Sequence, residues 1–354
     1  MKETTEVKET AGVKEAIVVE SALFGMGTII NHQVYGENAT KALAAANTET
    51  VRLEELLSRF KPDSDISRIN RSAGEREMGV SSETYEVLTS AVGFSEQLEG
   101  LFDITVGPLI DLWDGCKVSR KPPPRAIIQS VLPLINYRDI IFAFAPDRKT
   151  VALKKTGQSI DLGGVGKGYA ADRILAVFAA FGIKSAFTNF GGNVAAIGTK
   201  PDGSNWRVGI RHPRQEDALI GAVSIASKSV VTSGDYQRYF MGSDGRRYHH
   251  ILNPATGYPS ESGLISATVV AGSSMVADAL STALFVAGLH QGASFLAAIP
   301  GTEAILITQD LQIHITPGLT DSFVAQKGIN VNIINRNAVE QKSRKAGNAE
   351  ERSG

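Results

Sequence analysis

The chain has 354 residues, of which 43% are hydrophobic and 21% charged, and its formal net charge is −1. This composition is ordinary for a globular protein with ample core, and so small a charge gives no basic field for nucleic acid or an anionic membrane surface. The single cysteine, Cys116, excludes an intramolecular disulfide and a thiolate metal cluster.

The two ends of the chain are predicted to be tails. Residues 1–20 are rich in Lys, Glu and Thr, and a strand is expected to begin only near residue 16. This end has no apolar segment of signal-peptide length and no lipid-accepting cysteine, and no run is expected to approach the ~20 apolar residues of a membrane helix. A cytoplasmic protein without a membrane anchor is therefore expected. Residues 336–354 are charged and predict a disordered tail, which leaves residues 21–335 as one domain.

Helices and strands are interleaved within this domain without strict alternation. Apolar residues at three- and four-residue spacing predict helices, the second of them with Ser82 as its N-cap, over residues 37–60, 82–98, 169–181 and 274–287. Period-two patterns predict strands over residues 29–35, 140–144, 150–153, 206–210 and 222–226. The pattern favours a mixed α/β (α+β) architecture over a doubly wound sheet.

Residues 161–172, DLGGVGKGYAAD, lie between a strand-like run and a predicted helix. A backbone with few side chains can approach a ligand closely, and free N–H groups at a helix N-terminus suit a phosphate. The segment is not a Walker A loop, because Gly168 follows Lys167 where Ser or Thr is required, and Tyr169 replaces the third glycine of the dinucleotide fingerprint. It predicts an anion-binding strand–loop–helix, with a glycine-rich turn that binds nothing as the alternative.

A metal site and a base are the next candidates. Asp278 and Thr282 are four residues apart on a predicted helix, so both can offer oxygen to one ion, and oxygen ligands suit Mg²⁺ or Ca²⁺. The alternative is a pair that faces solvent or bonds the backbone, although apolar neighbours indicate that Asp278 is buried and needs a partner. His250 lies in a predicted irregular loop, residues 248–259, and is the best candidate base among six histidines, with a core or surface histidine as the alternative. His249 is expected to point elsewhere, and residues 231–236 are expected to form a tight turn.

Together these segments resemble the ApbE-type FAD:protein FMN transferases, from about residue 25 to residue 288. The segments that match the family motifs, in order, are residues 26–28, 58–60, 64–70, 102–109, Trp113, 161–172, 189–192, 232–236, 250–259 and 278–282. Each motif alone is weak, but so many in this order make a specific match.

The resemblance implies a T-fold-related architecture of mixed sheets flanked by helices, forming a single compact catalytic unit. It implies Mg²⁺-dependent transfer of FMN from FAD, with AMP released, to a threonine or serine of a target flavoprotein that carries a Ser/Thr-Gly-Ala-Thr-like motif. Mn²⁺ is left open as the ion. His250 would deprotonate the acceptor, and Thr232, Ser233 and Asp235 would shape the pocket. The implied metal ligands are the carbonyl of Gly164, Asp278, Thr282 and, in some members, Ser281. The implied FAD contacts are Met26, Phe60 (Tyr in many relatives), Leu101, Phe102, Asp103, Asp161, Lys167 and Leu252.

Two other functions stay open at this point. A Mg²⁺-dependent FAD pyrophosphatase would use water in place of the acceptor hydroxyl and would release FMN and AMP. A non-catalytic carrier would bind FAD without turnover, although the presence of both a base and metal-ligand candidates argues against pure binding.

Overall fold

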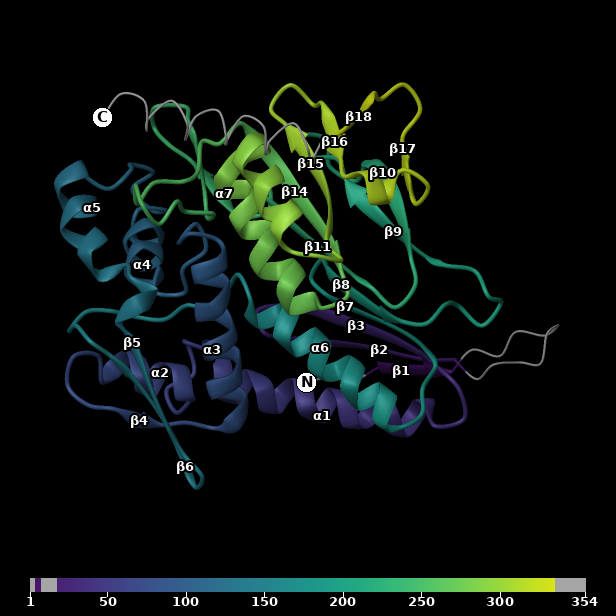
Figure 1. Ribbon diagram of the computed structural model, residues 1–354, viewed down its shortest axis with the longest axis horizontal. Helices are drawn as coiled ribbons and strands as arrows, with labels where there is room; N and C mark the ends of the chain where they lie inside the picture. Colours follow the sequence, from purple (N-terminus) through teal and green to yellow (C-terminus); the bar gives the residue numbers. More distant parts are fainter. Residues whose placement is uncertain (1–3, 8–17, 335–354) are drawn as a thin grey trace, which may run out of the picture.

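The computed structural model describes residues 4–7 and 18–334 (Figure 1). The predicted C-terminal tail and most of the predicted N-terminal tail lie outside these residues, so the domain boundaries stay predictions. Within the predicted N-terminal tail, β1 (Thr4–Val7) forms a strand that pairs with β2 (Val18–Gly25).

The main sheet has ten strands in the order β1-β2-β3-β7-β8-β11-β14-β15-β16-β18. Neighbouring strands are antiparallel except for the parallel pair β16 and β18. The strands after β2 are β3 (Thr28–Tyr35), β7 (Ser185–Phe190), β8 (Asn193–Ile197), β11 (Ser229–Gly234), β14 (Leu264–Ala271), β15 (Glu303–Thr308), β16 (Ile313–Ile315) and β18 (Val331–Ile333). All eight residues of β14 are buried, which fits a strand covered on both faces.

Two layers cover the sheet. Helices α1 (Ala39–Leu57), α6 (Gly166–Ala180) and α7 (Ser274–Ala298) pack on one face and form the larger core (Figure 1). The other face packs a second apolar core against a small sheet of β9 (Trp206–Arg211), β10 (Leu219–Ile225) and β17 (Phe323–Ala325). Alternate residues of the central strands serve the two cores, as period-two geometry requires.

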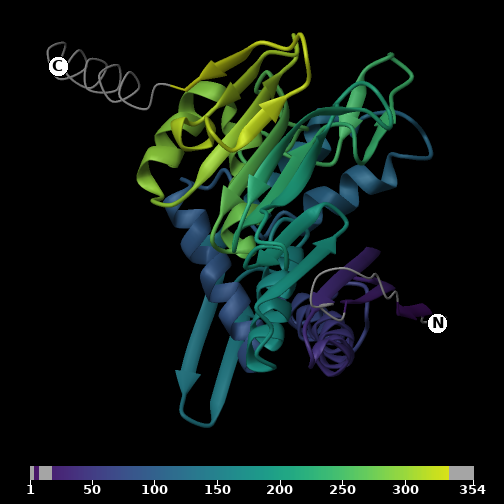
Figure 2. The ribbon, with the colours of Figure 1, turned by 90° about the vertical axis from the view of Figure 1, so that its right-hand side faces the viewer.

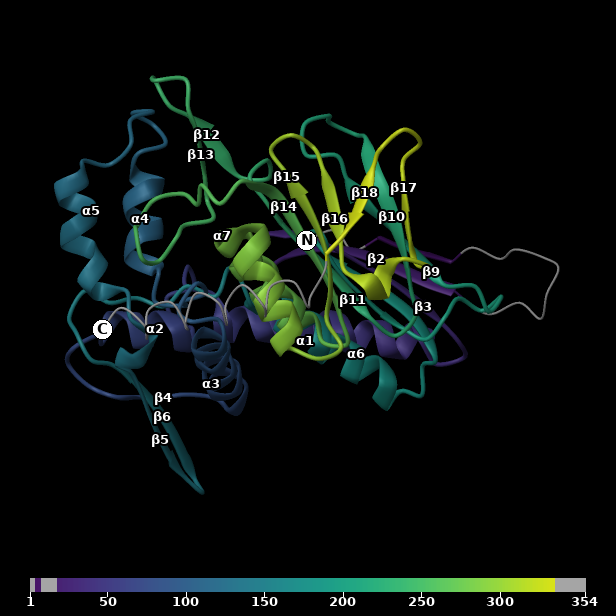
Figure 3. The same ribbon diagram turned by 45° about the horizontal axis from the view of Figure 1, so that its top comes forward.

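The remaining elements flank these layers (Figure 3). The helices are α2 (Asp65–Arg71), α3 (Ser82–Gln97), α4 (Gly107–Gly115) and α5 (Arg125–Val131), and three short 3₁₀ turns occupy Leu132–Leu134, Tyr137–Asp139 and Pro317–Leu319. A three-stranded sheet has the order β4 (Met78–Gly79), β6 (Arg148–Leu153), β5 (Ile140–Ala145), and a hairpin pairs β12 (Tyr239–Met241) with β13 (Arg247–His249). The β5–β6 hairpin extends away from the body of the protein (Figure 2).

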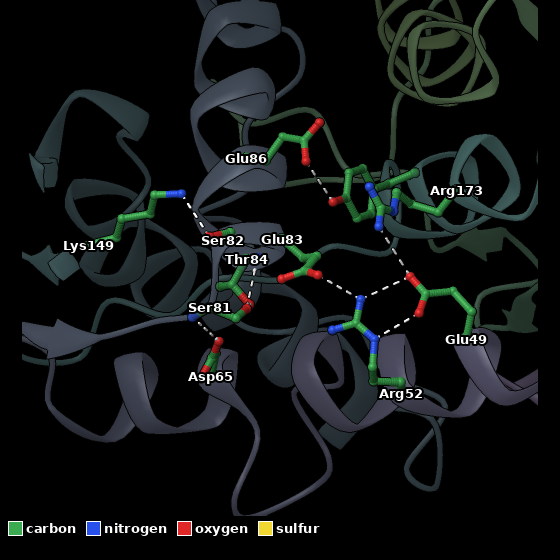
Figure 4. Close-up of polar contacts among 11 residues, drawn as sticks. Glu49, Arg52, Asp65, Ser81, Ser82, Glu83, Thr84, Glu86, Lys149 and Arg173 are labelled. Atoms are coloured by element: carbon green, nitrogen blue, oxygen red, sulfur yellow. Dashed lines mark hydrogen bonds and ion pairs between the residues drawn. The ribbon is translucent and has the colours of Figure 1, made fainter. Parts of the chain in front are cut away.

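Polar contacts tie α3 to the helices on the main sheet (Figure 4). The guanidinium of Arg52 on α1 donates to Glu49 at 2.7 Å and to Glu83 of α3 at 2.7 Å. The hydroxyl of Tyr169 on α6 donates to Glu86 of α3 at 3.0 Å. Partly exposed ion pairs contribute little each, so we regard this network as fixing the relative position of three helices more than as a source of stability.

The predicted mixed α/β class is confirmed, but four local predictions are wrong. The N-cap of α3 is Ser81, whose hydroxyl accepts from the Thr84 amide at 3.1 Å, and not Ser82. Residues 231–236 do not form a tight turn, because β11 runs through Gly234 and pairs with β14. The strand-like run before the glycine-rich loop makes only one isolated bridge, from Ser159 to Val106. The helix predicted over residues 274–287 is too short. In the structure α7 continues to Ala298, with a kink at Gly288, whose φ is 77°.

The expectation that no apolar run approaches membrane length is also wrong. By length and composition alone, α7 could cross a membrane. However, 67% of its most apolar window is buried, and the helix packs against β11, β14 and α6. We interpret α7 as the core helix of the main sheet.

A buried histidine makes the stability of this core depend on pH. The ring of His32 on β3 is 2% exposed, and its Nδ1 lies 2.8 Å from the hydroxyl of Thr188, while its Nε2 has no partner among the described residues. Burial lowers the pKa of His32 from 6.5 to about 4. The unfolded chain therefore binds this proton near pH 6.5 and the folded chain only near pH 4.

Protonation below pH 6.5 consequently favours the unfolded chain, and we expect the free energy of unfolding to fall by about 3 kcal/mol between pH 6.5 and 4 from His32 alone. Urea titrations of wild type and His32→Leu at a series of pH values measure this. The difference between the two proteins should change over that window, and a constant difference would show that His32 is not the titrating group.

Candidate functional site

The site is built where α6 begins against the first turns of α7. A Cβ added at Gly168 would lie 2.4 Å from the carbonyl oxygen of Ser274 and 2.8 Å from Cβ of Asp278. Only glycine allows two backbones this close. The close approach places the amide of Gly168 2.9 Å from Oδ2 of Asp278, which accepts its hydrogen bond.

The two helices cap each other. The N-cap residue of α6, Val165, has no capping side chain, so Asp278 of α7 supplies a carboxylate to the first turn of α6. In return, Asp172 of α6 accepts from the amides of Ser274 and Met275 at 2.7 and 3.0 Å. Burial raises the pKa of Asp172, and the negative charge of Asp278 adds to this. Reciprocal capping fixes the position of Asp278.

The four residues predicted as metal ligands lie near one another at this junction. The hydroxyls of Ser281 and Thr282 lie one turn after Asp278 on α7. They donate to the backbone carbonyl oxygen of Asp278, at 2.9 and 3.3 Å respectively. A Cβ placed on Gly164 would be 3.3 Å from Oγ1 of Thr282, so the loop backbone passes directly beside that hydroxyl. The hydroxyl of Ser233, from β11, reaches both, at 2.9 Å from Ser281 and 3.3 Å from Thr282.

The donor set fits a hard cation. No group of three or more His, Cys, Asp or Glu that could hold a metal is found among residues 4–7 and 18–334. The side-chain oxygens on these residues are the carboxylate of Asp278 and the hydroxyls of Ser233, Ser281 and Thr282, and Oδ1 of Asp278 makes no hydrogen bond or ion pair within the described residues. Such a partial shell suits Mg²⁺, which keeps several positions for water and phosphate oxygens.

Lys167 supplies the positive charge of the loop. Its Nζ donates to the carbonyl oxygen of Gly163 at 2.9 Å and lies 4.0 Å from Oδ2 of Asp278. A side chain held between the loop and the carboxylate can pair with an anion that binds at the helix N-terminus.

His250 follows β13 and lies at the start of the 250–259 segment. Its amide donates to the carbonyl oxygen of Arg238 at 3.1 Å, and its Nδ1 lies 3.1 Å from the same oxygen. An Nδ1–H that donates to this carbonyl leaves Nε2 with the free electron pair of a base. Although the residue is exposed, desolvation lowers the pKa of His250, and the charges of Arg238 and Lys167 act in the same direction. His250 is therefore neutral at neutral pH.

The neighbouring histidine, His249, was expected only to point elsewhere, and the structure gives it bonds within the fold. His249 is buried, its Nε2 lies 3.1 Å from the carbonyl oxygen of Ser260, and its Nδ1 accepts from the Ile251 amide at 3.3 Å. Its ring meets Phe285 edge to face. Burial lowers the pKa of His249 as well.

Asp161 shapes the loop, and a residue that sequence reasoning missed holds it. The Gly163 amide donates to Oδ1 of Asp161 at 2.7 Å, and Arg59 donates to Oδ2 at 3.0 Å. A second nitrogen of Arg59 donates to both oxygens of Asp111 on α4, each at 2.7 Å. The adjacent Phe60 is 84% exposed, so its ring is open to a flat ligand.

The other predicted FAD contacts divide into two groups. Phe102 lies 3.1 Å from a Cβ placed on Gly164, and the methyl carbon of Met26 lies 4.0 Å from one placed on Gly166, so both border the loop. By contrast, Asp103 is buried with its two oxygens occupied by Thr105 and Tyr137, and burial raises its pKa. Leu252 packs in a separate small core with Trp113, and Leu101 is half-buried. Their contacts with FAD stay predictions.

Gly168 offers a direct test of the helix contact. Gly168→Ala should destabilise the protein by about 1–3 kcal/mol, because the new methyl group meets backbone atoms of α7 that cannot move aside. Gly93 on α3 is the matched control, since nothing lies within 4 Å of an added Cβ, and Gly93→Ala should stabilise by about 0.5–1 kcal/mol. Denaturant unfolding measures both changes, and equal effects at the two positions would contradict the assigned contact.

A glycine-rich helix N-terminus beside a lysine and a cluster of side-chain oxygens has the groups that would suit a phosphate-bearing ligand and a hard cation. The ApbE family model matches residues 26–306, and the chain belongs to this family. It is 34% identical to the FAD:protein FMN transferase of Treponema pallidum (strain Nichols) over 317 residues, which cover 84% of this chain and 86% of that protein. It is also 34% identical to an FAD:protein FMN transferase of Klebsiella pneumoniae (strain 342), over 81% of this chain and 88% of the relative. The crystal structure of an ApbE protein from Thermotoga maritima superposes with a TM-score of 0.77 at 33% identity, covering 85% of this chain and 97% of the other.

Proposed function

We propose that this protein transfers FMN from FAD to a threonine or serine hydroxyl of an acceptor flavoprotein, in a Mg²⁺-dependent reaction. The observation that carries the proposal is the Asp278 carboxylate at the N-terminus of α6, with Ser281 and Thr282 one turn further along α7 and Gly164 beside Thr282. Relatives named FAD:protein FMN transferases support the activity itself. The ion, the acceptor motif and the cytoplasmic location stay predictions.

The reaction exchanges one phosphorus–oxygen bond for another. The acceptor oxygen attacks the phosphorus on the FMN side of the pyrophosphate, the bond from that phosphorus to the bridging oxygen breaks, and AMP leaves with the bridging oxygen. The hydroxyl proton passes to Nε2 of His250, which is neutral and unprotonated at that nitrogen. Lys167 would pair with the pyrophosphate beside the glycine-rich loop.

Asp278, Thr282, Ser281 and the Gly164 carbonyl would hold the ion, which when bound neutralises phosphate charge and aids departure of AMP. Other residues of the chain would hold these ligands in place. The Gly168 amide holds the Asp278 carboxylate, and the Ser233 hydroxyl orients the hydroxyls of Ser281 and Thr282. Phe60, which is exposed beside the Arg59–Asp161 pair, would stack on the isoalloxazine ring.

One incubation separates this function from its alternatives. The protein is mixed with FAD, Mg²⁺ and an acceptor domain that carries a Ser-Gly-Ala-Thr segment, and the acceptor is then weighed by mass spectrometry. We expect a mass gain of one FMN with one AMP released per acceptor. Free FMN with an unmodified acceptor would instead indicate a pyrophosphatase, and unchanged FAD would indicate a carrier.

A further inference from the structure

Helix α4 begins against the segment that leads into the glycine-rich loop. The Asp161 amide donates to the Ile104 carbonyl oxygen at 2.8 Å. Val106 forms a parallel bridge with Ser159. A Cβ added at Gly107, the first residue of α4, would lie 2.6 Å from the Ser159 carbonyl oxygen, so the two backbones are in direct contact. The start of α4 is therefore fixed to the run that precedes the loop.

The other end of α4 contacts the segment of residues 248–259, here called the histidine loop, through the side chain of Trp113 (Figure 3). This side chain is buried, and its indole N–H donates to the carbonyl oxygen of Gly257 at 2.8 Å. The centroid of its ring lies 5.3 Å from that of Tyr248 and 5.9 Å from that of Tyr258. One side chain of α4 therefore contacts both ends of the histidine loop.

Helix α4 is a short spacer that is attached at three points. It has nine residues and is therefore about 13 Å long. Between its two ends, Asp111 accepts from Arg59, which also donates to Asp161 beside the glycine-rich loop. Two attachments thus lie on the side of the glycine-rich loop, and the third, at Trp113, lies on the side of the histidine loop.

The side chains of the two loops lie within electrostatic range of each other. Desolvation lowers the pKa of His250, and the positive charge of Lys167 adds to this. Transfer of a proton to His250 depends on the distance between the ring and the hydroxyl that attacks beside the glycine-rich loop, and an error of about 1 Å in such a distance can cost about 10²-fold in rate.

We propose that Trp113 is a positioning residue, which through Gly257 holds the histidine loop, and with it His250, at a fixed distance from the glycine-rich loop. The inference rests on the proposed function, in which His250 takes the proton of the acceptor. Trp113 is 5% exposed, so it acts through the loop that it holds.

The second tryptophan of the chain provides a matched control. Trp206 on β9 is 4% exposed, and its indole N–H donates to the Gly198 carbonyl oxygen at 3.1 Å. Its ring stacks on Phe187, and it lies in the core on the other face of the main sheet. Trp113→Phe and Trp206→Phe therefore remove the same kind of hydrogen bond from two buried rings, and only the first bond reaches the histidine loop.

Rates of FMN attachment at saturating FAD, acceptor and Mg²⁺ compare the two variants, so that a change in FAD affinity does not enter. We expect Trp113→Phe to slow transfer by about 10- to 100-fold, because the histidine loop loses its anchor. Trp206→Phe should keep the wild-type rate, although both variants should have a lower thermal midpoint. A rate loss of equal size in both variants, or none in Trp113→Phe, would overturn the proposal.

A His250→Ala background shows whether Trp113 acts through that histidine. If it does, Trp113→Phe/His250→Ala should transfer FMN as fast as His250→Ala alone, because there is no base left to position. A further loss as large as the one that Trp113→Phe causes in wild type would show general support of the fold, and would overturn the positioning role.

Hydrogen–deuterium exchange tests the anchor without turnover. In the histidine loop, the Asn253 amide donates to the Tyr258 carbonyl oxygen and the Gly257 amide to that of Asn253, both at 2.8 Å. Trp113→Phe should speed exchange in residues 248–259, and Trp206→Phe should not. Unchanged exchange there would overturn the inference, whether or not wild type is active. A wild type that transfers no FMN but shows this exchange pattern would refute the proposed function and support the anchor.

Discussion

Asp278→Ala is expected to reduce FMN transfer by at least about 10³-fold, the largest effect we anticipate for any single substitution. Asp278 is the only carboxylate of the oxygen cluster, and its Oδ1 makes no other hydrogen bond or ion pair among the described residues. The substitution also removes the acceptor for the Gly168 amide, which leaves the first turn of α6 without its cap.

Two further measurements separate loss of the ion from loss of structure. Mg²⁺ that binds the folded protein should raise the thermal midpoint of wild type, and this rise should disappear in Asp278→Ala. Asp278→Asn keeps an oxygen that can accept from the Gly168 amide. Without Mg²⁺, its thermal midpoint should therefore be close to that of wild type, but Mg²⁺ should not raise it. Asp321→Ala, at an exposed aspartate, serves as the control. A variant that retains both the transfer rate and the Mg²⁺ response would remove Asp278 from the site.

Sequence patterns predicted those parts of the site that depend on local geometry. The four-residue spacing of Asp278 and Thr282 predicted one helix face for both, and α7 carries both, with the Thr282 hydroxyl donating to the backbone carbonyl of Asp278. Their joint role as metal ligands stays a prediction. The glycine-rich loop was predicted at the start of a helix for the same reason, although that helix begins three residues earlier than predicted. His249 and His250 were expected to point apart; His249 is buried against the Ser260 carbonyl, whereas His250 is exposed and contacts the Arg238 carbonyl.

Contacts between distant segments were beyond such patterns. Arg59 bonds Asp161 and Asp111 across 102 and 52 residues of sequence, and although residues 58–60 match a family motif, that match does not reveal these partners. Ser233 was expected in a turn because of the Thr-Ser-Gly-Asp sequence, but pairing with β14 extends β11 through it and aims its hydroxyl at α7. The tight requirement for glycine at position 168 follows only from how α6 packs on α7.

His250→Ala is expected to slow FMN transfer by roughly 10²–10⁴-fold while leaving the affinity for FAD nearly unchanged. The reason is geometric: Nδ1 is held by the Arg238 carbonyl, so only Nε2 can take a proton, and within residues 4–7 and 18–334 the ring makes no other hydrogen bond. The neighbouring His249→Ala is the matched comparison. It should lower the thermal midpoint, because it removes a buried ring with bonds to Ser260 and Ile251, and should change the transfer rate much less.

The pH dependence gives an independent readout of the same residue. The pKa of His250 lies below 6.5 in the folded protein, so the unprotonated form persists as the pH falls. The transfer rate should therefore stay nearly constant from pH 8 to below pH 6.5. Initial rates of FMN attachment, followed by acceptor mass at saturating FAD, would measure this. His250→Ala should lack the fall in rate at lower pH that wild type shows. A wild-type rate that falls with a midpoint at 6.5 or above, or a variant at full speed, would assign the proton transfer to another group.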